Sequence, residues 1–247
     1  MTTEQAMLAA LKRHFGYDAF LEGQSDVIEA LLGGDDLCVV MPTGAGKSLC
    51  YQLPALMRPG YTLVISPLIS LMKDQVDALN AKGIPAGCLN STMSNADRQT
   101  VMDLWYSGSL KLLYVAPERL RTRSFSNAVK NNPPDFLVVD EAHCISQWGH
   151  DFRPDYVKLG DVIAKLQVPQ VAAFTATATP VVREDIITQL QRPQMATYIT
   201  GFTRPNLRFQ VRLCSSQDDK LEVIRKTLAD RKPTIIYAAT RKNVDLL

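Results

Sequence analysis

Short apolar runs alternate with longer amphipathic stretches along most of the chain. Five apolar runs have the length of strands: residues 37–41, 62–66, 111–115, 136–139 and 171–175. Runs such as LCVVM and FLVV are apolar throughout, which is typical of strands buried on both faces. Stretches of helical length lie between them, for example residues 68–81 and 97–106. This alternation predicts an α/β fold with a mostly parallel sheet covered by helices.

The pattern breaks near residues 200–206, in the segment ITGFTRPN. A strand-like LRFQVRL, a helix over residues 220–230 and a further strand over residues 234–237 are predicted beyond it. The chain then ends at RKNVDLL, which resembles the beginning of a new helix. We therefore expect a first domain at residues 1–203 and only the start of a second at residues 204–247.

Composition excludes several classes of protein. The net charge is only +2, so any contact with nucleic acid must come from local placement of charge. The five cysteines form no C-x-x-C pair, so neither a zinc site nor a redox motif is expected. No apolar run approaches the ~18 residues that cross a bilayer, and the first fifteen residues predict an amphipathic helix rather than a secretion signal. A cytoplasmic protein without a membrane partner is expected.

The segment LCVVMPTGAGKSLCYQLPA predicts a buried strand, a glycine-rich turn and a helix. Two glycines allow the tight turn, Lys47 would contact the β- and γ-phosphates of a nucleotide, and the Ser48 hydroxyl would reach Mg²⁺. Met41 occupies the place where the general phosphate-loop pattern has a glycine. The alternative is a glycine turn followed by a surface lysine. The candidate nucleotide-binding residues here are Thr43, Gly44, Ala45, Gly46, Lys47, Ser48 and Leu49.

An acidic motif, Asp140-Glu141-Ala142-His143, follows the predicted strand over residues 136–139. A carboxylate at the carboxyl end of a parallel strand lies beside the phosphate loop in such folds. We expect Asp140 to hold Mg²⁺, Glu141 to polarise the attacking water and His143 to relay the nucleotide state. The hydroxyl groups of FTATAT, residues 174–179, would hydrogen-bond this motif; the alternative for that segment is a half-buried strand.

These motifs together resemble those of superfamily-two helicases, and the segments between them resemble the RecQ family of DNA helicases. In FGYDAFLEGQSDVI, residues 15–28, the resemblance implies that Gln24 reads the adenine edge, which a glutamine can do with two hydrogen bonds. The alternative is an exposed helix glutamine. Leu21 stands where the family usually has an arginine, and Thr203, in the segment that resembles the join between two lobes, stands where an aspartate is common.

Three further segments resemble DNA-contacting motifs of that family. SPLISLMKDQV and YVAPERL offer Ser66, Lys73 and Arg119 to a phosphate backbone, although either cation can be read as a solvated helix charge. CISQWGHDFRPDY, residues 144–156, resembles the aromatic-rich loop of RecQ helicases. Its aromatic side chains would stack on unpaired bases; the alternative is that they anchor the core. The candidates in this loop are Gln147, Trp148, Phe152 and Arg153, with His150 adding polar reach.

The resemblance implies a RecA-like motor lobe, followed by the start of a second, that uses ATP and Mg²⁺. It implies 3′-to-5′ unwinding of DNA by the intact protein, with single-stranded and partly duplex DNA as partners and association with the nucleoid if the source is bacterial. Residues 1–247 alone are expected to bind nucleotide weakly, with little hydrolysis and no unwinding. Two rival functions remain: a nucleotide- and DNA-binding module without productive hydrolysis, and an RNA-remodelling DEAH-type ATPase.

Overall fold

The computed structural model describes residues 2–149, 151–200, 207–229 and 231–244. Contacts between Cα atoms divide the chain into two compact units, Met1–Phe202 and Thr203–Leu247. The domain boundary expected from the sequence, between residues 203 and 204, lies outside the described residues, as does the departure at Thr203. Each unit is therefore described separately.

The first unit contains a seven-stranded sheet in which every pair of neighbours is parallel. The strand order is β3-β4-β2-β5-β6-β1-β7, so β1 and β5 are separated only by β6. The strands are β1 (Leu37–Val40), β2 (Thr62–Ile65), β3 (Ala86–Leu89), β4 (Leu112–Val115), β5 (Phe136–Val139), β6 (Val171–Thr175) and β7 (Ala196–Ile199). The predicted α/β class with a mostly parallel sheet is confirmed.

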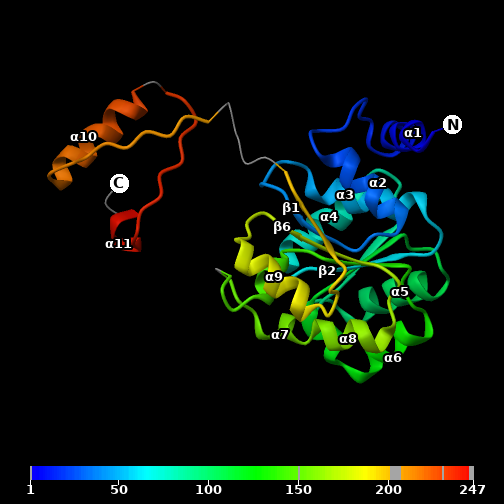
Figure 1. The fold of residues 1–247 in the computed structure, drawn as a ribbon. Coiled ribbons are helices and arrows are strands. Elements are labelled where there is room, and N and C mark those ends of the chain that lie inside the picture. The colour runs from blue at the N-terminus through cyan, green and yellow to red at the C-terminus, as the bar shows by residue number, and fades with distance from the viewer. Residues whose placement is uncertain (1, 150, 201–206, 230, 245–247) are drawn as a thin grey trace. The chain divides into compact units, whose positions relative to one another are not determined.

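Helices cover both faces of this sheet (Figure 1). α1 to α4 lie on one face, and α5 to α9 on the other. The first group is α1 (Thr3–Phe15), α2 (Gln24–Gly33), α3 (Lys47–Met57) and α4 (Ile69–Ala81). The second is α5 (Asn95–Tyr106), α6 (Arg123–Asn131), α7 (Pro154–Val157), α8 (Leu159–Leu166) and α9 (Pro180–Gln189), with the 3₁₀ turns η1 (Pro117–Arg121) and η2 (Ala142–Ile145).

The side chains of alternate strand residues pack into two separate hydrophobic cores, one on each face of the sheet. In β2, Leu63 and Ile65 pack with α5 to α9, whereas Val64 packs with α1 to α4. Because both faces of a central strand are buried, successive residues are all apolar and the strand is a continuous apolar run in the sequence. Two cores hold the sheet rigid, so the loops at its carboxyl edge project from fixed positions.

The second unit contains helix but no strand among its described residues. It consists of α10 (Gln217–Leu228), α11 (Arg241–Val244) and connecting segments. The helix predicted over residues 220–230 is confirmed as far as Leu228, although it begins earlier, at Gln217. The strands predicted over residues 207–213 and 234–237 are wrong: both segments lack strand structure, and Tyr237 is 91% exposed. An apolar run forms a stable strand only where neighbouring strands satisfy its backbone.

Within the described residues, no helix is long and apolar enough to cross a membrane.

Candidate functional site

The loop that joins β1 to α3 turns on two glycines with left-handed backbone. Gly44 has a φ of 84° and Gly46 a φ of 77°, values that residues with a side chain rarely adopt. Gly46 is also restricted by space, since a Cβ atom there would lie 2.3 Å from Gln24 Nε2. α3 begins directly afterwards, at Lys47, and the unpaired N–H groups of a first helical turn favour anions. The loop and the helix start therefore form a cradle suited to phosphate.

Met41 and Lys47 show how this chain builds the loop without its usual first glycine. The Met41 side chain is fully buried in the core beneath α3, so it does not obstruct the loop. Lys47 is half-buried, and its ammonium group donates a hydrogen bond to the Met41 carbonyl oxygen (3.3 Å). A solvated surface lysine does not fit this position, because the ammonium group folds back over the loop.

Gln24 holds the phosphate loop from α2. Its Nε2 donates to the carbonyl oxygens of Ala45 (3.1 Å) and Gly46 (3.3 Å), and its Oε1 accepts from the Leu21 N–H (2.9 Å). The side chain is only 2% exposed, so the alternative of an exposed helix glutamine is wrong. Its polar atoms are engaged with protein here, and its contact with adenine stays a prediction.

Gln24→Ala is expected to reduce the preference for ATP over GTP and to weaken both nucleotides. The loop would lose two backbone contacts worth about 0.5–1.5 kcal/mol each, which corresponds to a ~5- to 150-fold loss of affinity in all. Binding titrations with the two nucleotides measure both effects, and Gln99→Ala on the exposed side of α5 serves as the control. A uniform loss without a change in purine preference would assign Gln24 to loop positioning alone.

Asp140 lies directly after β5, buried beside the phosphate loop. Its N–H donates to the Ile65 carbonyl oxygen (2.8 Å), and its Oδ1 accepts from the Glu141 N–H (3.0 Å). Burial and the charge of Glu141 raise the pKa of Asp140 to about 6, and the Lys47 charge acts in the opposite direction. A divalent cation would stabilise the ionised carboxylate in place of a proton. Asp140 therefore fits a Mg²⁺ ligand on this side of the cradle.

Glu141 and His143 connect the acidic motif to β6. Glu141 has left-handed backbone (φ 49°, ψ 46°), which turns the chain out of the strand and into η2. His143 Nδ1 lies 3.3 Å from Glu141 Oε2 and 2.9 Å from Thr175 Oγ1. The predicted hydrogen bond between the acidic motif and the FTATAT segment is therefore present, and His143 lies between Glu141 and that segment.

Thr43, Glu141 and His143 line one open cleft of about 570 Å³. It brings together the phosphate loop, the acidic motif and the segments that follow β2 and β6. Its lining residues are Thr43, Pro67, Leu68, Glu141, His143, Cys144, Asp151, Ala176 and Thr177. The cleft is large enough for a polyphosphate group beside Glu141, the residue predicted to polarise water.

The loop after η2 exposes its aromatic side chains. Trp148 is 76% exposed and Phe152 37%, so Trp148 is not a core anchor, and Gln147 is exposed as well. Trp148 also lines a second hollow with His143 and Thr177. The predicted stacking surface is therefore accessible and adjoins the acidic motif. His150 lies outside the described residues.

The predicted cations are placed differently from one another. Arg153 donates to Asp151 Oδ2 (2.9 and 3.2 Å) and to the Pro67 carbonyl oxygen (3.1 Å), so it fastens the aromatic loop to the segment after β2. Lys73 is exposed on α4. Arg119 is half-buried with its guanidinium 5.7 Å from the centre of the Phe125 ring. Burial and the neighbouring Arg98 lower the pKa of Arg119. The positive charges of Arg98 and Arg119 together favour binding of an anion near η1.

Ser66 differs from the other predicted contacts because its side chain is 1% exposed. Its N–H donates to the Val115 carbonyl oxygen (3.1 Å), which fixes the end of β2 against β4. The Ser66 side chain is therefore buried, and its contact with DNA stays a prediction.

Sequence reasoning missed three neighbours of the acidic motif. The Tyr156 hydroxyl donates to the Asp140 carbonyl oxygen (3.2 Å), and Cys144 and Asp151 line the cleft. All three lie within CISQWGHDFRPDY, but the roles predicted in that segment belonged to Gln147, Trp148, His150, Phe152 and Arg153. Their contacts depend on the path of the loop, which no local spacing predicts.

Comparison with known proteins agrees with this geometry. Residues 21–186 match the model of the DEAD/DEAH box helicase family. The chain is 48% identical over 239 residues to the ATP-dependent DNA helicase RecQ of Haemophilus influenzae. The aligned region covers 96% of this chain and 38% of that protein. It is 44% identical over 237 residues to the ATP-dependent DNA helicase RecQ of Bacillus subtilis, covering 95% and 40% respectively.

The chain thus spans about two fifths of the length of these curated relatives. Among solved structures, the DUF1998 helicase MrfA matches the whole chain with a TM-score of 0.74 at 21% identity, over 40% of its own length. An identity this low speaks for the fold alone. The fold of this chain is therefore shared with that solved helicase.

Proposed function

Because the chain belongs to the DEAD/DEAH box helicase family and resembles the RecQ helicases, we propose that its first unit is a RecA-like motor lobe that hydrolyses ATP to unwind DNA. The substrates are single-stranded and partly duplex DNA. The direction of movement, 3′ to 5′, is the one that the resemblance implies.

ATP would lie in the cleft with its phosphates on the cradle between β1 and α3. Lys47 would bind the β- and γ-phosphates, while the Ser48 hydroxyl and Asp140 would hold Mg²⁺. When bound, Mg²⁺ neutralises charge that develops on the transferred phosphoryl group. Glu141 lines the cleft and would orient the attacking water and accept its proton. Thr43 lines the same cleft, and Leu49 lies on the first turn of α3.

One observation carries the coupling of hydrolysis to DNA: the acidic motif and the exposed aromatic side chains belong to one short stretch of chain. Glu141 contacts His143, which contacts Thr175, and Trp148 follows five residues after His143 on the same segment. The N–H of Trp148 is fixed by Ser146 Oγ (3.2 Å), close to η2. A base stacked on Trp148 would therefore shift the groups that act on the γ-phosphate.

Trp148→Ala tests this coupling. Base stacking is worth about 1–3 kcal/mol, so single-stranded DNA should bind ~5- to 150-fold more weakly. DNA-stimulated ATP hydrolysis by the full-length protein should fall far more than basal hydrolysis. The only other tryptophan, Trp105, is buried in the core, so quenching of exposed tryptophan fluorescence by DNA reports on Trp148 directly.

Tyr106→Ala, at an exposed aromatic residue of α5, is the matched control. Equal loss of basal and stimulated hydrolysis in Trp148→Ala, without a change in DNA affinity, would contradict the coupling and favour the binding module or another nucleic acid as partner.

By themselves, residues 1–247 are expected to bind nucleotide but not to unwind DNA. Hydrolysis by related proteins uses arginines from a second lobe, each worth 10³–10⁵ in rate, and translocation needs two lobes that open and close. Among its described residues the second unit has no sheet. Strand separation is measured on duplexes with a 3′ or a 5′ tail. Processive unwinding by this chain would overturn the expectation, and unwinding only from a 5′ tail by the full-length protein would overturn the direction.

A further inference from the structure

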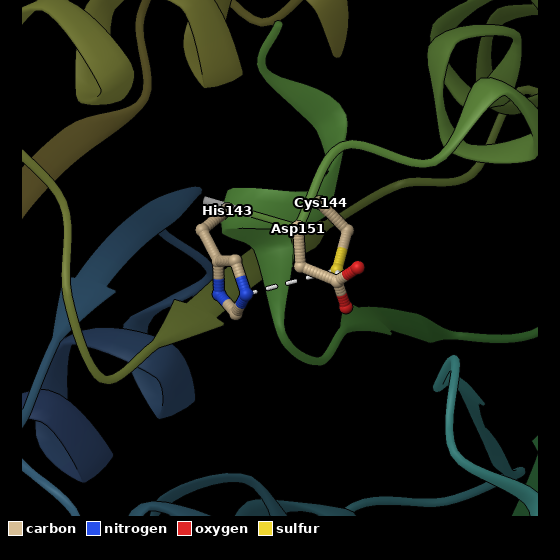
Figure 2. A group of neighbouring side chains, drawn as sticks. All are labelled: His143, Cys144 and Asp151. Atoms are coloured by element: carbon tan, nitrogen blue, oxygen red, sulfur yellow. Dashed lines mark hydrogen bonds between the residues drawn. The ribbon is translucent and has the colours of Figure 1, made fainter. Parts of the chain in front are cut away.

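Three side chains beside the cleft bring three different metal-binding atoms together. Figure 2 shows the imidazole of His143 facing the sulfur of Cys144 and the carboxylate of Asp151. Cys144 Sγ lies 3.7 Å from His143 Nε2 and 3.8 Å from Asp151 Oδ2. One donor atom from each residue falls within 4.8 Å of the other two. Tetrahedral Zn²⁺, with bonds of ~2.3 Å to sulfur and ~2.0 Å to nitrogen or oxygen, separates such atoms by about 3.5 Å.

The surroundings of His143 prepare its ring for a metal ion. The Thr175 hydroxyl lies 3.2 Å from the Thr177 carbonyl oxygen, to which it can donate, and its oxygen is then an acceptor for His143 Nδ1, 2.9 Å away. Glu141 Oε2, at 3.3 Å, is a second acceptor for Nδ1. With the proton on Nδ1, both oxygens act as its acceptors and Nε2 presents its lone pair toward Cys144. Metal-binding histidines are typically oriented in this way, by an oxygen acceptor on the other ring nitrogen.

The three residues all line the cleft of about 570 Å³, so an ion and a water ligand can enter from solvent. Arg153 opposes a cation, because its guanidinium donates to Asp151 Oδ2. The Pro67 carbonyl oxygen also holds that guanidinium, so Arg153 keeps a partner when the carboxylate turns to a metal. Among the described residues this is the one group of three such donors.

We propose that His143, Cys144 and Asp151 form a binding site for a thiophilic divalent cation such as Zn²⁺. Binding breaks the S–H bond of Cys144, releases the proton to solvent and forms a metal–sulfur bond, with water as the fourth ligand. The ion ties η2 to the far side of the aromatic loop, seven residues later. It thereby holds the loop against the acidic motif and inhibits DNA-stimulated hydrolysis. The inhibition rests on the proposed function, whereas the site itself does not.

Co²⁺ is the probe for the site, because a cobalt–thiolate bond gives an absorption band that aqueous Co²⁺ lacks. Residues 1–247 are titrated with Co²⁺ in the presence of Mg²⁺, and Zn²⁺ is then used to displace it. One Co²⁺ per chain is expected, with the thiolate band. Cys144→Ser should abolish the band, and Asp151→Asn, at an exposed position, should weaken binding at least ~10-fold. Cys214→Ser, which removes a thiol of the second unit, should bind as the parent chain does.

Retention of the band and of the affinity in both Cys144→Ser and Asp151→Asn would overturn the site, as would loss of the band in Cys214→Ser. In the full-length protein, Zn²⁺ should inhibit DNA-stimulated ATP hydrolysis. In the Cys144→Ser variant of that protein, Zn²⁺ should leave this hydrolysis unchanged. Equal inhibition of both forms would overturn the regulatory part. Absence of any ATP hydrolysis would overturn the proposed function, while the Co²⁺ result would still decide the metal site.

Discussion

Replacing Glu141 with glutamine is expected to slow ATP hydrolysis ~100- to 10,000-fold and to leave ATP·Mg²⁺ affinity nearly unchanged. A positioned general base contributes a factor of this size, and glutamine cannot accept the proton of the attacking water. Glutamine has the same length and keeps an oxygen for His143, which lies 3.3 Å from Glu141 Oε2. The cleft should therefore keep its shape. Single-turnover hydrolysis and a nucleotide-binding titration, both on the full-length protein, separate the two effects.

Glu29→Gln provides the matched control, because Glu29 lies exposed on α2 outside the cleft. Wild-type turnover by Glu141→Gln would show that another residue activates water. A parallel loss of nucleotide affinity would instead assign Glu141 to binding.

Lys47→Ala is expected to weaken ATP·Mg²⁺ binding ~10- to 150-fold and to abolish measurable turnover. Hydrogen bonds that involve a charged group are worth about 1.5–3 kcal/mol, and the described residues that line the cleft include no lysine or arginine that could replace Lys47. In the structure the ammonium group rests on the Met41 carbonyl oxygen, from which it can swing to a phosphate. Calorimetric titration of residues 1–247 with ATP and Mg²⁺ measures the binding part.

Lys82→Ala, at an exposed lysine just after α4, removes the same charge away from the loop. If both variants bound nucleotide as the parent chain does, Lys47 would have no role at the phosphates, and the glycine turn would be structural only.

The central strands were predictable because each one is decided locally. The predicted strands 37–41, 62–66, 111–115, 136–139 and 171–175 agree with β1, β2, β4, β5 and β6 to within one residue at either end. Burial on both faces leaves an unbroken apolar run, and that signal needs no knowledge of partners. The helices α4 and α5 were found for a similar reason, from apolar residues at helical spacing.

The edges of the fold were not predictable in this way. β3 contains a glycine and β7 is mostly exposed, so neither has a strong apolar run; each forms because one neighbour offers a free edge. The segment TIIY, residues 234–237, is the opposite case, a strong apolar run without a strand. Its β-branched and aromatic residues favour a strand, but the described residues of the second unit provide no partner strand.

In the site, the residue types could be predicted but not their contacts. The sequence identified Gln24, Lys47 and Glu141, because phosphate and carboxylate chemistry restricts which residues serve at such positions. It did not reveal that Gln24 holds the loop backbone or that Arg153 fastens the aromatic loop to Pro67. It also did not indicate the metal site proposed above, because C-x-x-C pairs are lacking. Residues 143, 144 and 151 meet only because the loop folds back.

The left-handed backbone of Glu141 lowers fold stability at the residue that we propose activates water. A residue with a side chain adopts this conformation at a cost of about 1–3 kcal/mol, whereas glycine adopts it freely. Selection for thermostability alone would therefore favour glycine at position 141. A glutamate at this position fits the proposed role of Glu141 in hydrolysis, and other parts of the fold must then supply the stability that this turn loses.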